Sequence, residues 1–73
     1  MTPKETYLKK VGASIRKERI AKLIKQETLA KKVGLSKSEI SRIENGTREI
    51  KIDMLRKIAI AIGIHSSSLY DHQ

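Results

Sequence analysis

The stretch QETLAKKVGLSKSEISRIEN, residues 26–45, predicts two short helices joined by a tight turn. Gly34 stands near its middle, and glycine adopts the left-handed conformation that ends a helix at little cost. Ser36 and Glu39 have the spacing of a capping box, so we expect a second helix to begin directly after the turn. The apolar residues that would bury both helices are Leu29, Ala30, Val33, Leu35, Ile40 and Ile43.

Two helices that cross steeply through such a turn form a helix-turn-helix, which offers its second helix to the major groove of DNA. Ala30 lies where the two helices come closest, because a larger side chain there would push them apart. The polar side chains left on the outer face are Lys37, Ser38, Ser41 and Arg42. We therefore expect residues 1–73 to form a single DNA-binding domain, with the helix-turn-helix at residues 26–45.

Outside this stretch the sequence predicts three more helices and no strand. One covers residues 4–22, after a flexible arm of residues 1–4, and its Gly12 would let another helix approach closely. A later helix ends at Gly63, and residues 66–70 could form a short last one. The apolar residues on these helices are Leu8, Val11 and Ile15, then Ile52, Leu55, Ile58, Ala59 and Ile62. The expected fold is an all-α, compact five-helix domain.

Charge indicates the class of partner. The chain carries 16 Lys and Arg residues against 8 Asp and Glu residues, a formal net charge of +8 at pH 7. Residues 1–22 hold +5 of this charge, residues 23–46 hold +2, and residues 47–73 hold +1. The excess predicts a polyanionic partner. Lysines that only keep helix faces soluble are the alternative explanation.

Composition argues against several other classes of protein. Cysteine is absent, which removes disulfide scaffolds and thiolate sites and fits a reducing compartment. No apolar run approaches the roughly 18 residues that a membrane span needs, and no signal peptide is evident. His65 and His72 are the only histidines, without a third metal ligand or a nucleophile beside them. We expect a cytoplasmic protein that is not an enzyme, with no cofactor, membrane contact or small-molecule ligand.

The chain also resembles a known family, the Cro/repressor-type helix-turn-helix domains of phage repressors, xenobiotic-element regulators and restriction-modification controller proteins. The similar segments are VGASIRKER (11–19), QETLAKKVGLSKSEISRIENGTR (26–48) and LRKIAIAIGIHSSSLY (55–70). The resemblance implies a lambda-repressor-like fold with the helix-turn-helix at its second and third helices. It also implies a buried ion pair between Arg19 and Glu44. From the residues alone, Arg19 would be a surface base and Glu44 a helix-end acid.

Three positions depart from the family pattern. The family usually has Gly where Leu23 stands, a Ser or Thr cap where Lys25 stands, and Pro where Ile50 stands. A left-handed conformation at Leu23 would cost about 1–2 kcal/mol. Lys25 offers no side-chain acceptor to cap a helix. We therefore expect an atypical bend between the first two helices.

By resemblance, Gln26 contacts a DNA phosphate at the start of the second helix, and backbone amides near Asn45 to Thr47 hold another. Arg48, in the following loop, is expected to grip phosphate rather than a base. The first-helix bases Arg16 and Lys17 are expected to be solvated rather than bound. The residues expected to read bases are Ser36, Lys37, Ser38, Glu39 and Arg42.

Arg42 is the leading base reader, because its guanidinium can bond guanine O6 and N7 together. Lys37 can offer a single donor to guanine or bind a phosphate. Glu39 could accept from cytosine N4, but its capping-box role explains its presence equally well.

One helix in one groove contacts too few base pairs to find a site in a genome, so we expect a homodimer on a palindromic operator. By resemblance, the dimer interface lies around the last helix, at Ile64, Leu69 and Tyr70. Closing the monomer core is the alternative role for these three residues. Another possible function is an antitoxin-like regulator that binds a partner protein as well as DNA, and a third is non-specific DNA binding by charge.

Overall fold

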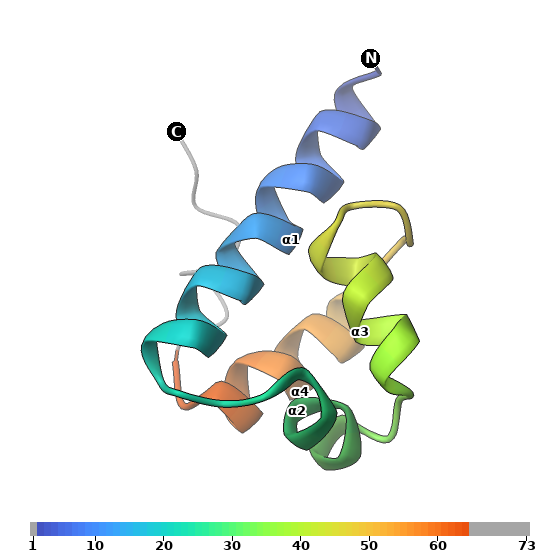
Figure 1. The fold of residues 1–73 in the computed structure, drawn as a ribbon. Coiled ribbons are helices and arrows are strands. Elements are labelled where there is room, and N and C mark those ends of the chain that lie inside the picture. Colours follow the sequence, from blue (N-terminus) through green and yellow to red (C-terminus); the bar gives the residue numbers. More distant parts are fainter. Residues whose placement is uncertain (1, 65–73) are drawn as a thin grey trace.

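A computed structural model describes residues 2–64 of the chain, and in this part it contains helices and no strand. The helices run in the order α1 (Pro3–Ala21), α2 (Gln26–Val33), α3 (Lys37–Glu44) and α4 (Ile52–Ile62) (Figure 1). The all-α prediction is confirmed. The helix expected at residues 66–70, together with His65, Leu69, Tyr70 and His72, lies outside the described residues.

Helix ends follow the local sequence closely. The capping box is present as predicted, since the Glu39 amide donates to Ser36 Oγ at 3.1 Å and the Ser36 amide donates to Glu39 Oε1 at 3.0 Å. Gly34 ends α2 with a φ of 76°. Lys25 precedes α2 without a side-chain capping hydrogen bond, as expected of a lysine.

The first residues of the chain differ from the expected flexible arm. Thr2 caps α1 by accepting from the Glu5 amide at 3.1 Å, and Pro3 is the first helical residue. Lys4 forms an exposed ion pair with Glu49 at 2.8 Å. Proline suits this position because its ring presets a helical φ and the first turn needs no amide donor from it. Helix α1 therefore starts earlier than the sequence predicted.

The core is aliphatic and draws on all four of these helices. Helix α1 packs on α3 and α4, and α2 packs on the same two helices. The buried apolar residues are Val11, Ile15, Leu29, Ala30, Val33, Ile40, Ile43, Leu55, Ile58, Ala59 and Ile62. Ile52, which the sequence placed among them, is 53% exposed. As the first residue of α4 it lies beyond the edge of the core, and the buried face of that helix begins one turn later.

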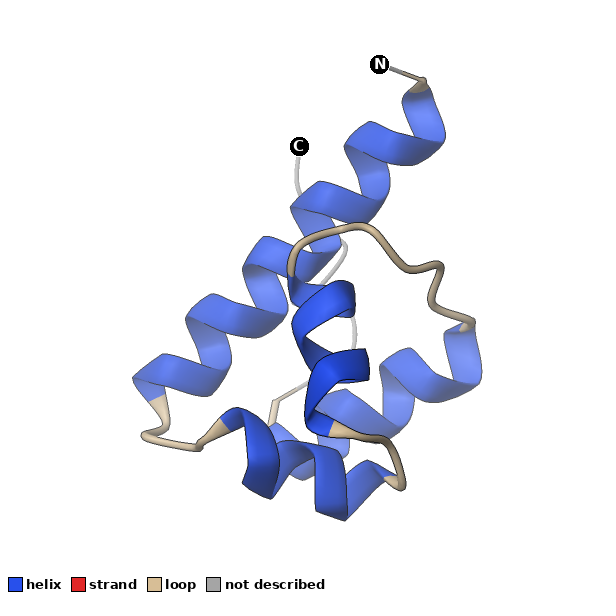
Figure 2. Ribbon diagram, turned by 45° about the vertical axis from the view of Figure 1, so that its right-hand side comes forward, coloured by secondary structure: helices blue, strands red, loops and turns tan. Residues whose placement is uncertain are grey.

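Gly12 fixes how closely α1 approaches α3. A Cβ built there would lie 2.3 Å from the Ile43 carbonyl oxygen and 2.6 Å from that of Glu44. The two backbones are therefore in direct contact at the C-terminal end of α3, which is the close approach that the sequence suggested. Figure 2 shows α3 in front of the other helices, with its outer side uncovered.

The bend between α1 and α2 is a glycine-type helix end built with leucine. The Ile24 amide donates to the Arg19 carbonyl at 3.0 Å, and the Leu23 amide to that of Ile20 at 2.9 Å. This is the Schellman pattern, which places Leu23 at the left-handed position. Leu23 has a φ of 58° and is 92% exposed. The bend thus keeps the geometry that glycine favours, and the leucine bears the strain.

We expect Leu23→Gly to stabilise the protein by about 0.5–1 kcal/mol in urea denaturation. Glycine removes a left-handed strain of about 1–2 kcal/mol, and its extra freedom in the unfolded chain takes back part of that gain. Leu23→Ala is the control, since alanine keeps a Cβ in the same conformation. An equal gain from alanine would assign the effect to lost apolar exposure and contradict the strain.

Candidate nucleic-acid interface

A buried ion pair joins α1 to the end of α3. Arg19 donates to Glu44 through Nε, at 2.6 Å from Oε2, and through Nη2, at 3.1 Å from Oε1. The two side chains are 10% and 1% exposed. Arg19 Nη1 also donates to the Ile24 carbonyl at 2.7 Å. One guanidinium therefore holds the end of α3 and the bend before α2 together.

Gln26 adds the start of α2 to the same carboxylate. Its Nε2 donates to Glu44 Oε1 at 2.9 Å, and the residue is half-buried. The opposite amide orientation would place the Gln26 carbonyl oxygen against an ionised carboxylate, so the network fixes which end faces Glu44. Helices α1, α2 and α3 thus all meet at one carboxylate.

The outer face of α3 carries short and long polar side chains. Ser36, Lys37, Ser38 and Arg42 are exposed, whereas Ser41 is half-buried. The Ser36 and Ser38 hydroxyls lie 3.2 Å apart. Four of the five predicted base readers therefore share an open surface at and after the start of α3.

Glu39, the fifth predicted reader, contacts two other residues of the protein, Ser36 and Arg48. Its Oε1 accepts from the Ser36 amide, and its Oε2 lies 2.7 Å from Arg48 Nη1. The hydrogen bonds from Ser36 lower the pKa of Glu39 below its usual 4.5, and Arg48 and Arg42 lower it further. The carboxylate is thus ionised at neutral pH. It already has one hydrogen-bond donor, the Ser36 amide, and one ion-pair partner, Arg48.

The turn after α3 bears on the expected phosphate contact. The amides of Asn45, Gly46 and Thr47 donate to the carbonyls of Ser41, Ile43 and Arg42 at 2.9–3.1 Å. These amides already have acceptors at the helix end, so the phosphate contact stays a prediction. The side chains of Asn45, Thr47 and Arg48 are the other candidates for it at this turn.

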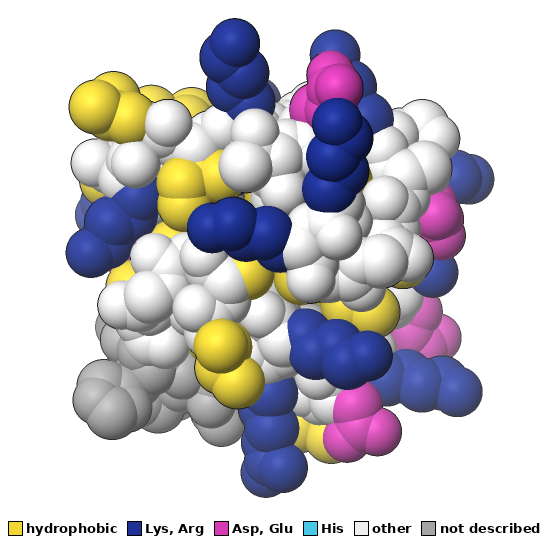
Figure 3. All heavy atoms as spheres, turned by 90° about the horizontal axis from the view of Figure 1, so that it is seen from below, with side chains coloured by type: hydrophobic (Ala, Val, Ile, Leu, Met, Phe, Trp, Pro, Cys, Tyr) yellow, Lys and Arg dark blue, Asp and Glu magenta, His cyan; other side chains and the backbone are white. Residues whose placement is uncertain are grey.

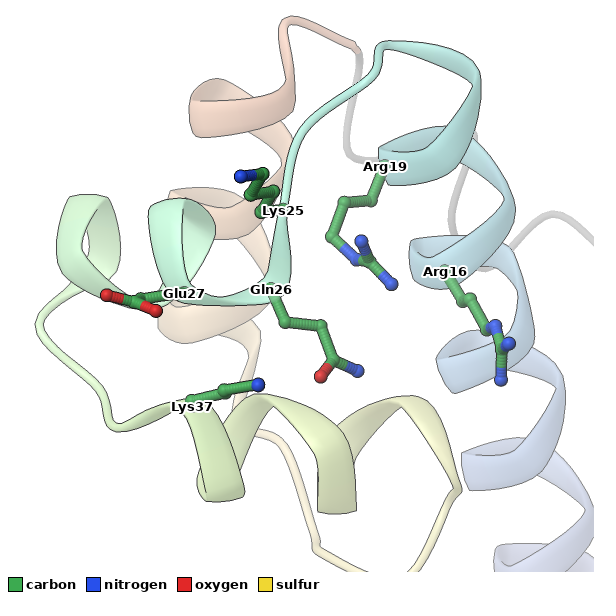
Figure 4. A pocket seen from close by; sticks show the side chains of 6 residues that line it. All are labelled: Arg16, Arg19, Lys25, Gln26, Glu27 and Lys37. Carbon is green, nitrogen blue, oxygen red and sulfur yellow. The ribbon is translucent and has the colours of Figure 1, made fainter.

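A basic cleft lies between α1 and the starts of α2 and α3. Its volume is about 430 Å³, and its lining residues are Arg16, Arg19, Lys25, Gln26, Glu27 and Lys37. Arg19, Gln26 and Lys37 point into the space between the helices, Arg16 extends along α1, and Glu27 points away from that space (Figure 4). The cleft brings a predicted phosphate contact and a predicted base reader side by side.

Arg16 also lines this cleft and is exposed, and the expectation that it is solvated rather than bound stays a prediction. Arg16 and Arg19 are three residues apart and share one face of α1. Figure 3 shows Lys and Arg side chains spread over the face seen from below, with apolar side chains between them. Part of the positive charge that the composition gives is therefore presented on this face.

The described part of the chain contains neither a candidate metal cluster nor a candidate membrane span. Residues 2–64 contain no group of three or more His, Cys, Asp or Glu side chains that could hold a metal ion. Each of the described helices is too short or too polar to cross a membrane.

Comparisons with known proteins agree on one family. Residues 15–69 match the family described as Helix-turn-helix. The chain is 38% identical over 61 residues to the control protein C.BamHI of Bacillus amyloliquefaciens, covering 82% of this chain and 75% of that protein. It is 41% identical over 56 residues to a 10 kDa protein of the ImmF control region of Bacillus phage phi105, covering 77% of this chain and 62% of that protein.

A solved structure extends the similarity to the fold. The restriction-modification controller protein C.AhdI from Aeromonas hydrophila matches with a TM-score of 0.88 and 33% identity. The match covers 94% of this chain and 100% of that chain.

We expect Arg19→Ala to reduce the free energy of unfolding by about 3–5 kcal/mol, because it leaves the buried Glu44 carboxylate without its cation. Chemical denaturation measures the loss, and Arg16→Ala, one turn earlier on α1 and exposed, is the matched control. Replacing both Arg19 and Glu44 by Met should cost less than Arg19→Ala alone. Unchanged stability of Arg19→Ala would show that the pair carries little of the fold's stability.

Proposed function

This chain belongs to the helix-turn-helix family, and from that premise we propose that it is a transcriptional regulator that binds double-stranded DNA sequence-specifically. The observation that carries the proposal is the outer face of α3, which is polar, open and held in place by the buried Glu44 carboxylate. A helix presented in this way fits the major groove. Residues 26–45 would be the reading part of a single domain formed by residues 1–73.

Base reading falls to the exposed residues of α3. Arg42 would bond guanine O6 and N7 with its guanidinium, and Lys37 would offer one donor to guanine or to a phosphate. Ser36 and Ser38 are short enough to let the groove floor approach the start of the helix. Glu39 would read a base only from the orientation in which the Ser36 amide and Arg48 hold its carboxylate.

Phosphate binding would flank the reading face on two sides. On one side, Gln26, at the start of α2, would contact the sugar-phosphate backbone of the DNA. Arg16 lines the same cleft and would add positive charge there. On the other side, the side chains of Asn45, Thr47 and Arg48 lie in the turn after α3. Such contacts would set the register of the helix in the groove.

Two copies would be needed for a specific site. The small reading face of one copy contacts only a few base pairs, so we propose a homodimer on a palindromic operator. Ile64, at the end of the described chain, is half-buried and packs against the core, and Ile60 on α4 is 78% exposed. The interface would lie there and include Leu69 and Tyr70, outside the described residues. Because two relatives are named as control or controller proteins, we propose a cytoplasmic control regulator of the same kind.

Selection of duplexes from random DNA is the test of this function. The expected result is a palindromic consensus with half-sites about one helical turn apart. Affinity for that site should fall steeply with salt, with a log–log slope of about −0.9 for each neutralised phosphate. A flat salt response, or selection without enrichment, would contradict sequence-specific DNA binding.

We expect Arg42→Ala to lose about 1–3 kcal/mol of binding free energy on the selected site, because a bidentate base contact disappears. Binding to random DNA should change little. Arg56→Ala, which removes the same charge from an exposed position on α4, is the control for charge alone. Fluorescence anisotropy with both duplexes measures the difference, and equal losses on both would remove Arg42 from base reading.

A further inference from the structure

In the turn after α3, the Arg48 side chain reaches back toward the start of that helix. The preceding residue, Thr47, is anchored to the last turn of α3, because its amide and its hydroxyl donate to the Arg42 carbonyl at 2.9 and 3.2 Å. From this fixed point, the Arg48 side chain reaches Glu39 in the first turn of α3, with Nη1 2.7 Å from Oε2. The two residues are nine positions apart, and the anchored turn makes their contact possible.

Glu39 is poorly placed to act alone against DNA. Its Oε1 is held by the Ser36 amide and its Oε2 by Arg48. An ionised carboxylate on a surface that faces phosphates raises the free energy of the complex unless a cation compensates for it. The Glu39 carboxylate keeps free acceptor sites, but the capping box and the ion pair with Arg48 both hold it in one orientation, 30% exposed.

Arg48, in contrast, keeps unused donors. Its side chain is 37% exposed, and a guanidinium carries five N–H groups in a rigid fork. Nη1 is shielded from solvent and has no aligned hydrogen-bond acceptor among the described residues, so its contact with Glu39 is an ion pair. The pair therefore fixes where the guanidinium lies without saturating it.

Arg48 also takes Glu39 in preference to a nearer acid in the sequence. Glu49 is its direct neighbour, yet Glu49 pairs with Lys4 at 2.8 Å. Both of those side chains are highly exposed, at 66% and 63%, whereas Glu39 is 30% exposed. The loop thus directs Arg48 toward α3.

We propose that Glu39 is a positioning residue that holds the Arg48 guanidinium against the first turn of α3, so that Arg48, and not the Glu39 carboxylate, meets the DNA. This inference rests on the proposed DNA-binding function. Glu39 would then affect the affinity for DNA only through Arg48. Replacing Glu39 should therefore have no effect on affinity once Arg48 is gone.

A double-mutant cycle of Glu39→Gln and Arg48→Ala tests the proposal. Glutamine also serves in a capping box, so Glu39→Gln should keep α3 intact, and thermal unfolding checks this. Affinity for the selected duplex and for random duplex is measured by fluorescence anisotropy over a range of salt concentrations. Glu49→Gln removes the same charge from the position next to Arg48, without touching α3, and is the matched control.

Arg48→Ala is expected to weaken binding about tenfold, the size of a lost charge-assisted hydrogen bond. Its salt slope should fall by about 0.9 per protomer, as expected for one phosphate contact. Glu39→Gln should also weaken binding, by about threefold, although it makes the protein more positive. With Arg48 already replaced, Glu39→Gln should cause no loss. Glu49→Gln should leave binding unchanged or strengthen it.

Three results would overturn the proposal. If Glu39→Gln strengthens binding equally with and without Arg48, Glu39 is only a repelling charge. If it relaxes the preference at one base pair in both backgrounds, Glu39 reads that base directly. In both cases the wild-type protein still binds the selected duplex, and the proposed function stands. If the wild-type protein binds no duplex, the proposed function fails and this inference fails with it.

Discussion

The relative placement of the first three helices depends on the Glu44 carboxylate. It is nearly inaccessible to solvent and receives donors from Arg19 on α1 and from Gln26 on α2. A buried carboxylate is costly unless its oxygens are hydrogen-bonded and a cation lies beside it, so loss of one donor disturbs the whole arrangement. The network adds direction, because hydrogen bonds satisfy their geometry in one arrangement of the helices, whereas aliphatic side chains tolerate several.

Close backbone contact supplies the second constraint. With Gly12 against the carbonyls of Ile43 and Glu44, α1 reaches α3 without an intervening side chain. This contact lies beside the ion pair, so the C-terminal end of α3 is fixed by both packing and hydrogen bonding. The N-terminal end of α3 depends on local interactions, namely the capping box of Ser36 and Glu39. The exposed outer face of α3 lies between these two anchored ends.

The sequence predicts features that depend on a few neighbouring residues, such as helix ends. It does not predict contacts that form only once the turns are folded. Gly34 and the capping box mark the boundaries of α2 and α3, because each acts within a few residues. The partner of Glu44 could be named only through family resemblance, since 25 residues separate it from Arg19. The contact between Glu39 and Arg48 had no sequence signal, because it requires the turn to be folded first.

The charge of the outer face of α3 also has a non-local origin. The sequence of α3, KSEISRIE, contains two cations and two anions and is neutral by itself. One anion, Glu44, is buried against Arg19 from α1, and the other, Glu39, is paired with Arg48 from the following turn. The two cations of α3 remain exposed. A helix that is neutral in sequence thus becomes cationic at its outer face because arginines from outside it compensate both acids. A polyanion approaching α3 would therefore meet basic side chains first, and the acids would serve to hold the helix and its neighbours in place.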